Sequence, residues 1–243
     1  MGKRILVQRR GRGSSVFTAS THKRVAPAKY PNLTKIDIMN KVLKGQVLEL
    51  LHDPGRGAPL AYIELETGER YYTLAVEGMR EGQIIEVGGK ASINIGNILP
   101  IGVIPEGTVV CNIEVLPGDG GKLVRASGAY ATVLSHTPEG TLISLPSGKT
   151  RYINDQCLAM IGVVAASGRI EKPFVKAGKK FHWMRAKGHK YPRVRGRAMI
   201  AALHPFGSGR RSAKKPTAVS RNAPPGRKVG QIAAKRTGRK KRK

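Results

Sequence analysis

Three short stretches of this sequence contain residue types that could do chemistry, and the first is HPFGSGRR, residues 204–211. A lone histidine, His204, is followed there by a proline, a glycine loop and two arginines. A histidine on a loop can serve as a general base. Glycines followed by arginines can instead bring backbone and positive charge close to phosphate groups. The stretch therefore indicates either catalysis or contact with a polyanion.

The second stretch, HDPGRGAP, places His52 beside Asp53. Adjacent residues in a strand point to opposite faces, and no third group is evident that would orient the histidine. A turn with two glycines that presents Arg56 and backbone amides to a phosphate fits the stretch better than an acid–base pair.

The third stretch, LPSGKTRYI, contains the SGKT end of a phosphate-binding loop. That motif requires a glycine at the position of Ile143 and a helix after the loop, whereas TRYI has the pattern of a strand. GRGSSV at residues 11–16 also fails the dinucleotide-binding pattern at its last position. A hairpin turn at Ser147-Gly148 is the better interpretation.

The charge of the chain is divided very unevenly. The net charge is +29 over 243 residues, with a pI of about 10.8. Residues 1–40 carry +8, residues 41–165 carry −3, and residues 166–243 carry +24 with Glu171 as the single acid. An excess of this size indicates a polyanionic partner, and its position indicates two basic arms on a near-neutral body.

The body has the pattern of an all-β protein. Between residues 46 and 153, short apolar runs recur about every ten residues and are separated by breaks such as PGDGG, TPEG and PSG. The stretch at residues 88–102 divides the body into two halves, each long enough for a small barrel. We expect four parts, at 1–35 (basic extension), 36–95 (barrel), 96–175 (barrel) and 176–243 (basic extension). We expect the arms to be irregular, because they contain too few large apolar residues to form a core alone.

Residues 176–197, KAGKKFHWMRAKGHKYPRVRGR, interleave basic side chains with rings. This composition is typical of RNA contact, with cations on phosphates and rings stacked on bases. The alternative is that the rings pack on the second barrel, and we expect Trp183 to do some packing. Cys111 and Cys157 lack metal-binding or redox spacing, so we expect two small buried side chains. The basic start MGKRILVQRRGRGSS predicts neither a signal peptide nor a membrane span.

Seven stretches carry a resemblance to a known family. In order they are HDPGRGAP, INIGNILPIGVIPEGT, PGDGGKLVRASGAYATV, GVVAASGRIEKPFVKAG, PRVRGRAM, HPFGSG and APPGRKVGQIAAKRTGR. Together they make the chain similar to the universal second protein of the large ribosomal subunit, in its archaeal and eukaryotic form. The resemblance covers essentially the whole chain.

The resemblance implies an oligonucleotide-binding-like barrel, then an SH3-like barrel, with both arms threaded into ribosomal RNA. It implies early rRNA binding, help in joining the two subunits, and support of tRNA placement near the peptidyl transferase centre. A catalytic role for the histidine that matches His204 has been proposed for the family and is disputed. This sequence departs from the family at Ile200, Leu203 and Ser208, where Asn, an acid and Gly are usual. Because Leu203 replaces the nearest partner for a base, we predict RNA contact and no catalysis for His204.

The sequence thus predicts a structural rRNA-binding protein of the large subunit, located in cytoplasmic ribosomes, and no enzyme. Expected partners are large-subunit rRNA, neighbouring ribosomal proteins and a small-subunit contact, with no membrane and no homo-oligomer. We expect no cofactor and no metal site, since Mg²⁺ or K⁺ near the arms would belong to the RNA. Two alternatives stay open: a non-specific nucleic-acid packaging protein, and an RNA-processing or acyl-transfer enzyme that uses His204.

The predicted RNA contacts are basic residues chosen by their clustering, together with His204. They are Arg9, Arg10, Arg12, Arg56, Arg125, Lys179, Lys180, Arg185, Lys187, Arg193, Arg195, Arg197, His204, Arg210, Arg211, Arg227 and Lys228.

Overall fold

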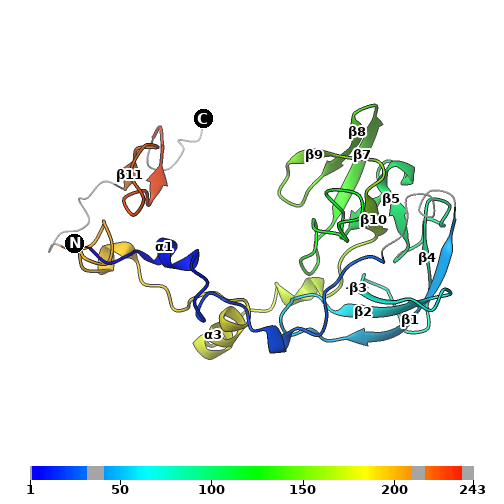
Figure 1. Cartoon of the computed structure of the whole chain (residues 1–243), viewed down its shortest axis with the longest axis horizontal. Helices are drawn as coiled ribbons and strands as arrows, with labels where there is room; N and C mark the ends of the chain where they lie inside the picture. The colour runs from blue at the N-terminus through cyan, green and yellow to red at the C-terminus, as the bar shows by residue number, and fades with distance from the viewer. Residues whose placement is uncertain (1, 32–40, 209–216, 237–243) are drawn as a thin grey trace. The chain divides into compact units, whose positions relative to one another are not determined.

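The computed structural model describes residues 2–31, 41–208 and 217–236 (Figure 1). The chain divides into two units. Thr21–Val175 forms the first, called here the barrel unit, and Met1–Ser20 with Lys176–Lys243 forms the second, called the arm unit. The two arms of the sequence therefore associate with each other.

The described residues of the barrel unit form ten strands, and the all-β fold class predicted from the sequence is confirmed. The strands are β1 (Leu43–Leu51), β2 (Leu60–Leu65), β3 (Arg70–Leu74), β4 (Ile84–Val87), β5 (Ile98–Pro100), β6 (Val109–Cys111), β7 (Ala131–Thr137), β8 (Gly140–Ser144), β9 (Thr150–Ile153) and β10 (Leu158–Ile161). They pair in the order β3-β2-β1-β4-β5-β10-β6-β7-β8-β9. Short 3-10 turns cover Thr21–Lys23, Ile101–Val103 and Ser167–Arg169.

Two hairpins form where the turn signals of the sequence place them. β2 and β3 pair antiparallel around the turn at residues 66–69, and Tyr62 stacks on Tyr72 across the pair at 4.6 Å. β8 and β9 pair antiparallel around Ser147-Gly148, with φ of +76° at Gly148. The strand after SGKT confirms that this stretch is a hairpin turn and not a phosphate-binding loop.

The sequence predicts two barrels, and the unit has two hydrophobic cores that share a wall. The wall consists of β5, β6 and β10, whose alternate residues point to opposite faces. One core receives Ile98, Cys111, Leu158 and Met160. The other core receives Leu99, Val110, Ala159 and Ile161. Because both faces of the wall are buried, its strands are continuous apolar runs. The wall begins at Ile98, so strands from the second half of the body complete the core of the first half as well as that of the second.

The arm unit contains α1 (Leu6–Arg10), α3 (Ala177–Ala186), a 3-10 turn at Gly196–Ala198, and the strands β11 (Ala218–Val219) and β12 (Gln231–Ile232), which pair parallel. The two arms are joined where the Lys3 amide donates to the Ala202 carbonyl at 2.7 Å. The prediction of irregular arms is thus wrong for residues 6–10 and 177–186. Across the described ranges of both units, no helix has the length and apolar content needed to span a membrane.

Candidate RNA interface

Nearly the whole charge of the chain belongs to the arm unit. Its sequence contains 28 Lys and Arg residues and no Asp or Glu, whereas the barrel unit contains 16 basic and 15 acidic residues. A segment without a single acid cannot neutralise itself, so its cations require an external anion. The arm unit is therefore the first candidate for an RNA-binding surface.

Helix α3 presents part of this charge on a regular scaffold. Its sequence AGKKFHWMRA has no proline and no β-branched residue, and the helix ends before Gly188, which has φ of +68°. Lys179 and Arg185 are exposed on it, and only Ala186 is buried. The cations are held at helical spacing along a surface that is free of carboxylates.

The rings of this segment pack against its own lysines. Lys187 Nζ lies 4.1 Å from the centre of the Trp183 ring, and Lys180 Nζ lies 5.5 Å from that of Tyr191. One face of Trp183 is thus covered by a cation of its own segment, and packing of this residue on the second barrel stays a prediction. Phe181 keeps 40% of its surface exposed, which leaves its ring available to a base.

Residues 204–208, HPFGS, form a compact turn closed by backbone hydrogen bonds. The Gly207 amide donates to the His204 carbonyl at 2.9 Å, and the Ser208 amide donates to the Met199 carbonyl at 3.0 Å. A Cβ atom on Gly207 would collide with the carbonyl oxygens of Met199 and Ile200. Gly207 is therefore required for the close approach of two backbone segments.

The His204 ring accepts a hydrogen bond from the Phe206 amide at Nδ1, at 3.1 Å, and its centre lies 5.0 Å from the Phe206 ring. Partial burial, and then the charge of Arg193, lower the pKa of His204 below its ordinary value. Because Nδ1 accepts the Phe206 amide, the proton of the neutral ring is on Nε2. No carboxylate contacts the ring within the described residues of the arm unit, which has no acid in its sequence.

In the barrel unit, Arg56 and Arg125 hold the segment that precedes β1. Arg56 Nε pairs with Asp53 Oδ2 at 2.7 Å, and its Nη2 donates to the Ala26 carbonyl at 2.7 Å. Arg125 donates to the carbonyls of Ala28 and Gly121, at 2.8 and 2.7 Å. Desolvation and the charge of Arg56 lower the pKa of Arg125. Both predicted RNA contacts thus have structural partners, which the sequence did not reveal.

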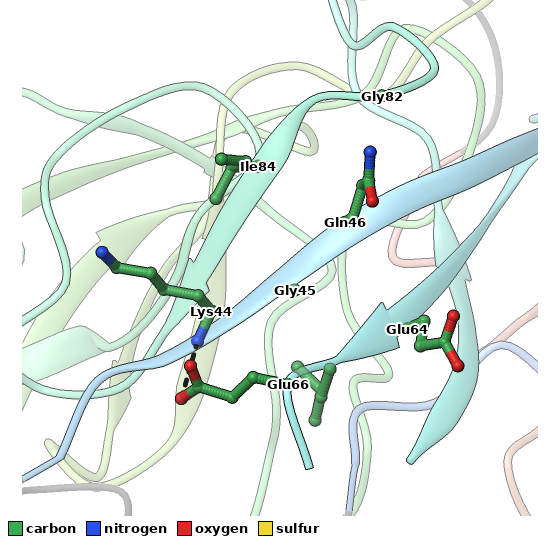
Figure 2. A pocket seen from close by; sticks show the side chains of 8 residues that line it. Lys44, Gly45, Gln46, Glu64, Glu66, Gly82 and Ile84 are labelled. Carbon is green, nitrogen blue, oxygen red and sulfur yellow. Dashed lines mark hydrogen bonds between the residues drawn. The ribbon is translucent and has the colours of Figure 1, made fainter. Parts of the chain in front are cut away.

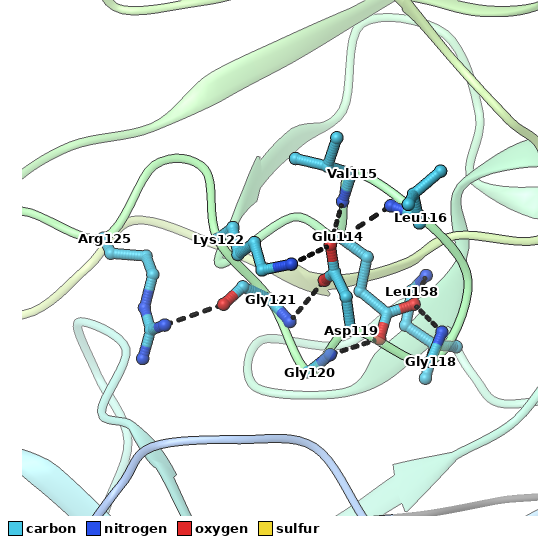
Figure 3. A network of polar contacts seen from close by, with 10 residues as sticks. All are labelled: Glu114, Val115, Leu116, Gly118, Asp119, Gly120, Gly121, Lys122, Arg125 and Leu158. Atoms are coloured by element: carbon cyan, nitrogen blue, oxygen red, sulfur yellow. Dashed lines mark hydrogen bonds and ion pairs between the residues drawn. The ribbon is translucent and has the colours of Figure 1, made fainter.

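The PGDGG loop beside Arg125 is organised by two carboxylates (Figure 3). Glu114 is 1% exposed and accepts the amides of Gly118, Gly120 and Leu158 at 2.8–3.2 Å. Asp119 accepts three further amides and the Lys122 ammonium, at 3.1–3.2 Å. Both carboxylates are therefore satisfied by hydrogen bonds that fix the shape of the loop and, through Leu158, attach it to β10.

A groove of about 410 Å³ at the ends of β1 and β2 has the opposite character to the arms (Figure 2). Glu64 and Glu66 line it together with Lys44 and Ile84. Glu64 pairs with Arg70 at 2.8 Å, and Glu66 accepts the Lys44 amide. Two carboxylates at one groove repel phosphate, so the barrel unit does not offer RNA a uniformly positive surface.

The predicted contacts fall into three groups by their surroundings. Exposed are Arg9, Arg10, Arg12, Lys179, Arg185, Arg193, Arg195, Arg197, Arg227 and Lys228. Partly buried are Arg56, Arg125, Lys180, Lys187 and His204. Outside the described residues are Arg210 and Arg211. The structure adds Lys190, which lines a cavity together with Arg9, Arg193 and His204. Within the described residues, no group of three His, Cys, Asp or Glu could hold a metal ion.

The fold and the charge distribution define a class of protein: a near-neutral β-barrel body that carries acid-free basic extensions suited to nucleic acid. The chain matches two family models. The RNA-binding N-terminal domain of ribosomal proteins L2 matches residues 3–87, and the C-terminal domain of ribosomal proteins L2 matches residues 94–228. The chain belongs to the ribosomal protein L2 family.

Curated relatives agree with this assignment over nearly their whole length. The chain is 58% identical to the large ribosomal subunit protein uL2 of Thermofilum pendens, over 99% of this chain and 97% of the relative. It is 57% identical to the protein of the same name from Methanocaldococcus jannaschii, over 99% and 100%. The protein of that name from Halorubrum lacusprofundi is 53% identical, over 98% of each chain.

Proposed function

We propose that this chain is a structural constituent of the large ribosomal subunit and binds the rRNA of that subunit. The observation that carries the proposal is the division of charge, with 28 basic and no acidic residues in the arm unit against 16 and 15 in the barrel unit. The match to an RNA-binding domain model and the names of the relatives support it.

The mechanism is neutralisation by the arms and recognition of RNA shape by the barrels. We assign neutralisation to residues 1–35 and 176–243, and shape recognition to the barrels at 36–95 and 96–175. Folded RNA brings phosphates close together, and the cations of the arms reduce their mutual repulsion. Arg56 and Arg125 can take part as well, because a guanidinium has five N–H donors and each already uses only some of them inside the protein.

Further roles are expected of a protein that binds the rRNA of the large subunit. The protein contacts neighbouring ribosomal proteins and the small subunit, supports tRNA placement, and maintains the architecture of the peptidyl transferase centre as a single copy in cytoplasmic ribosomes. It needs no cofactor of its own, and Mg²⁺ or K⁺ near it belong to the RNA. It is not an enzyme: His204 lies in a unit whose sequence has no carboxylate to stabilise an imidazolium, which supports RNA contact instead.

The test is the salt dependence of rRNA binding by the full chain, measured by filter binding. Each phosphate contact adds about 0.9 to the log–log slope for a B-form duplex and about 0.7 for a single strand. Replacing the exposed arm residues Lys179, Arg185 and Arg195 by Gln is therefore expected to lower the slope by about two to three units.

The matched control removes three exposed cations of the barrel unit, Lys90, Lys149 and Arg151, with the same change in net charge. It is expected to leave most of the slope in place. An equal loss from both triple variants would contradict the assignment of neutralisation to the arms. Binding of duplex DNA as tight as binding of rRNA would favour the packaging protein instead.

A further inference from the structure

The arm unit contains a cavity between α1 and residues 190–204, with a volume of about 440 Å³. Its floor is apolar and is formed mainly by Leu6, Val194, Met199, Ile200 and Leu203. Its polar lining consists of Arg9, Lys190, Arg193 and His204. No carboxylate lines it, and the volume lies within the range of pockets that hold small organic groups.

The side chains that line the cavity favour an occupant with an apolar surface and a negative charge. Ile200 is 63% exposed at the cavity although it is a large apolar side chain, so it is available to cover a flat hydrophobic surface. The three cations beside it attract an anion. A nucleotide of RNA combines these properties, since it has a flat base and a phosphate on either side. RNA-binding proteins commonly take up unpaired bases in this way.

The His204 ring adds a directed hydrogen-bond donor. Because its Nδ1 accepts the Phe206 amide at 3.1 Å, the proton of the neutral ring is on Nε2. The ring is confined on another side by Gly196, where any Cβ atom would collide with it. An N–H donor in a fixed ring, beside an apolar floor, suits the acceptor edge of a base.

We propose that this cavity receives one unstacked base of the bound RNA, with Ile200 and Leu203 against the plane of the base and His204 Nε2–H donating to its edge. The inference rests on the proposed function, because the base belongs to the rRNA. It assigns to Ile200 and Leu203 a direct contact with RNA and to His204 the role of a donor.

The experiment compares the full wild-type chain with Ile200→Asn, assembled on large-subunit rRNA and irradiated with ultraviolet light. Nucleotide adducts on peptides are then identified by mass spectrometry. The matched control is Ile232→Asn, since Ile232 lies in β12 of the same unit, is 47% exposed and does not line the cavity. Neither substitution changes the net charge or a buried side chain.

Wild type and Ile232→Asn are expected to give adducts of one defined nucleotide at Met199, Leu203 or His204. Ile200→Asn is expected to lose most of this yield and to weaken rRNA binding by about five- to tenfold, since the apolar contact with the base is lost, with an unchanged salt slope. Adducts elsewhere in the arms remain in all three proteins and report on RNA binding itself.

Three results would overturn the inference and leave the proposed function intact: adducts elsewhere in the arms but none at the cavity, cavity adducts spread over many nucleotides, or equal losses in the two Asn variants. A chain that gives no RNA adduct at any arm residue would overturn the proposed function together with the inference.

Discussion

Replacement of Arg56 by Ala is expected to destabilise the barrel unit strongly. The Asp53 side chain has no exposed surface, and Arg56 is its cationic partner at 2.7 Å. Removing one partner of a buried ion pair leaves an uncompensated charge and costs about 3–5 kcal/mol. Arg56 also holds the Ala26 carbonyl, whereas Asp53 keeps the Gly55 amide at 2.9 Å after the change. We therefore expect a loss near the lower end, about 3 kcal/mol.

The assay is urea denaturation of the full chain. Unfolding is monitored by circular dichroism and by the exposure of tyrosines that are buried in the native state. With a slope of about 1–3 kcal/mol per molar urea, a loss of about 3 kcal/mol lowers the midpoint by about 1–3 M. The control is Arg70→Ala, because Arg70 pairs with Glu64 at a similar distance, 2.8 Å, in an exposed position. An exposed pair is screened by water, so we expect little change in its midpoint.

The double variant Asp53→Asn/Arg56→Met separates charge from shape. It removes both charges and keeps much of the volume, so it should recover a large part of the stability that Arg56→Ala loses. Equal midpoints for Arg56→Ala and Arg70→Ala would refute the argument that burial makes the Arg56 pair important. A double variant as unstable as Arg56→Ala would refute its electrostatic cause.

Three further predictions concern single groups. A proton NMR titration of His204 should have a midpoint below the ordinary histidine pKa, because burial disfavours the imidazolium. The folded state should therefore lose a little stability as the pH falls below that ordinary pKa toward the lowered one. An ordinary midpoint would contradict the partly buried position of the ring. Burial raises the pKa of Cys111 and Cys157 to about 12, so iodoacetamide should label them at neutral pH only after denaturation, as mass spectrometry can check. Gly207→Ala should lower the thermal midpoint by forcing two backbone segments apart, whereas Gly178→Ala, with open space in α3, should preserve or raise it; equal shifts would refute the steric argument.

Local signals made much of the barrel unit predictable. The hairpins around residues 66–69 and 147–148 follow from turn residues between alternating strands, which act over a few positions. Cys111 and Cys157 are buried and free, and their burial was predicted from spacing that fits neither a metal site nor a redox pair. The sequence did not reveal the wall shared by the two cores, because pairing of β10 with β5 joins positions about 60 residues apart.

Helix α3 escaped prediction for a different reason. Its apolar residues do not repeat on one face, and Ala186 is its single buried residue, so no hydrophobic period marks it. Two of its cations, Lys179 and Arg185, are exposed, and the prediction that they contact RNA rests on the basic composition of the segment. The charge of each residue is known directly from the sequence. A helix that buries few side chains can be predicted only from the helix propensities of its residues, which are a weak signal.

The apolar side chains at Ile200 and Leu203 depart from the family pattern, and the fold gives a reason for them that the sequence does not. The resemblance implies polar groups at these two positions, so the apolar side chains found there weaken the prediction of a catalytic role for His204. In the structure they line one cavity with Leu6, a residue of the opposite arm almost 200 positions away. An acid at position 203 would place a negative charge among cations that a phosphate must reach, whereas leucine leaves that approach open. The same substitution that argues against a base therefore argues for a binding surface.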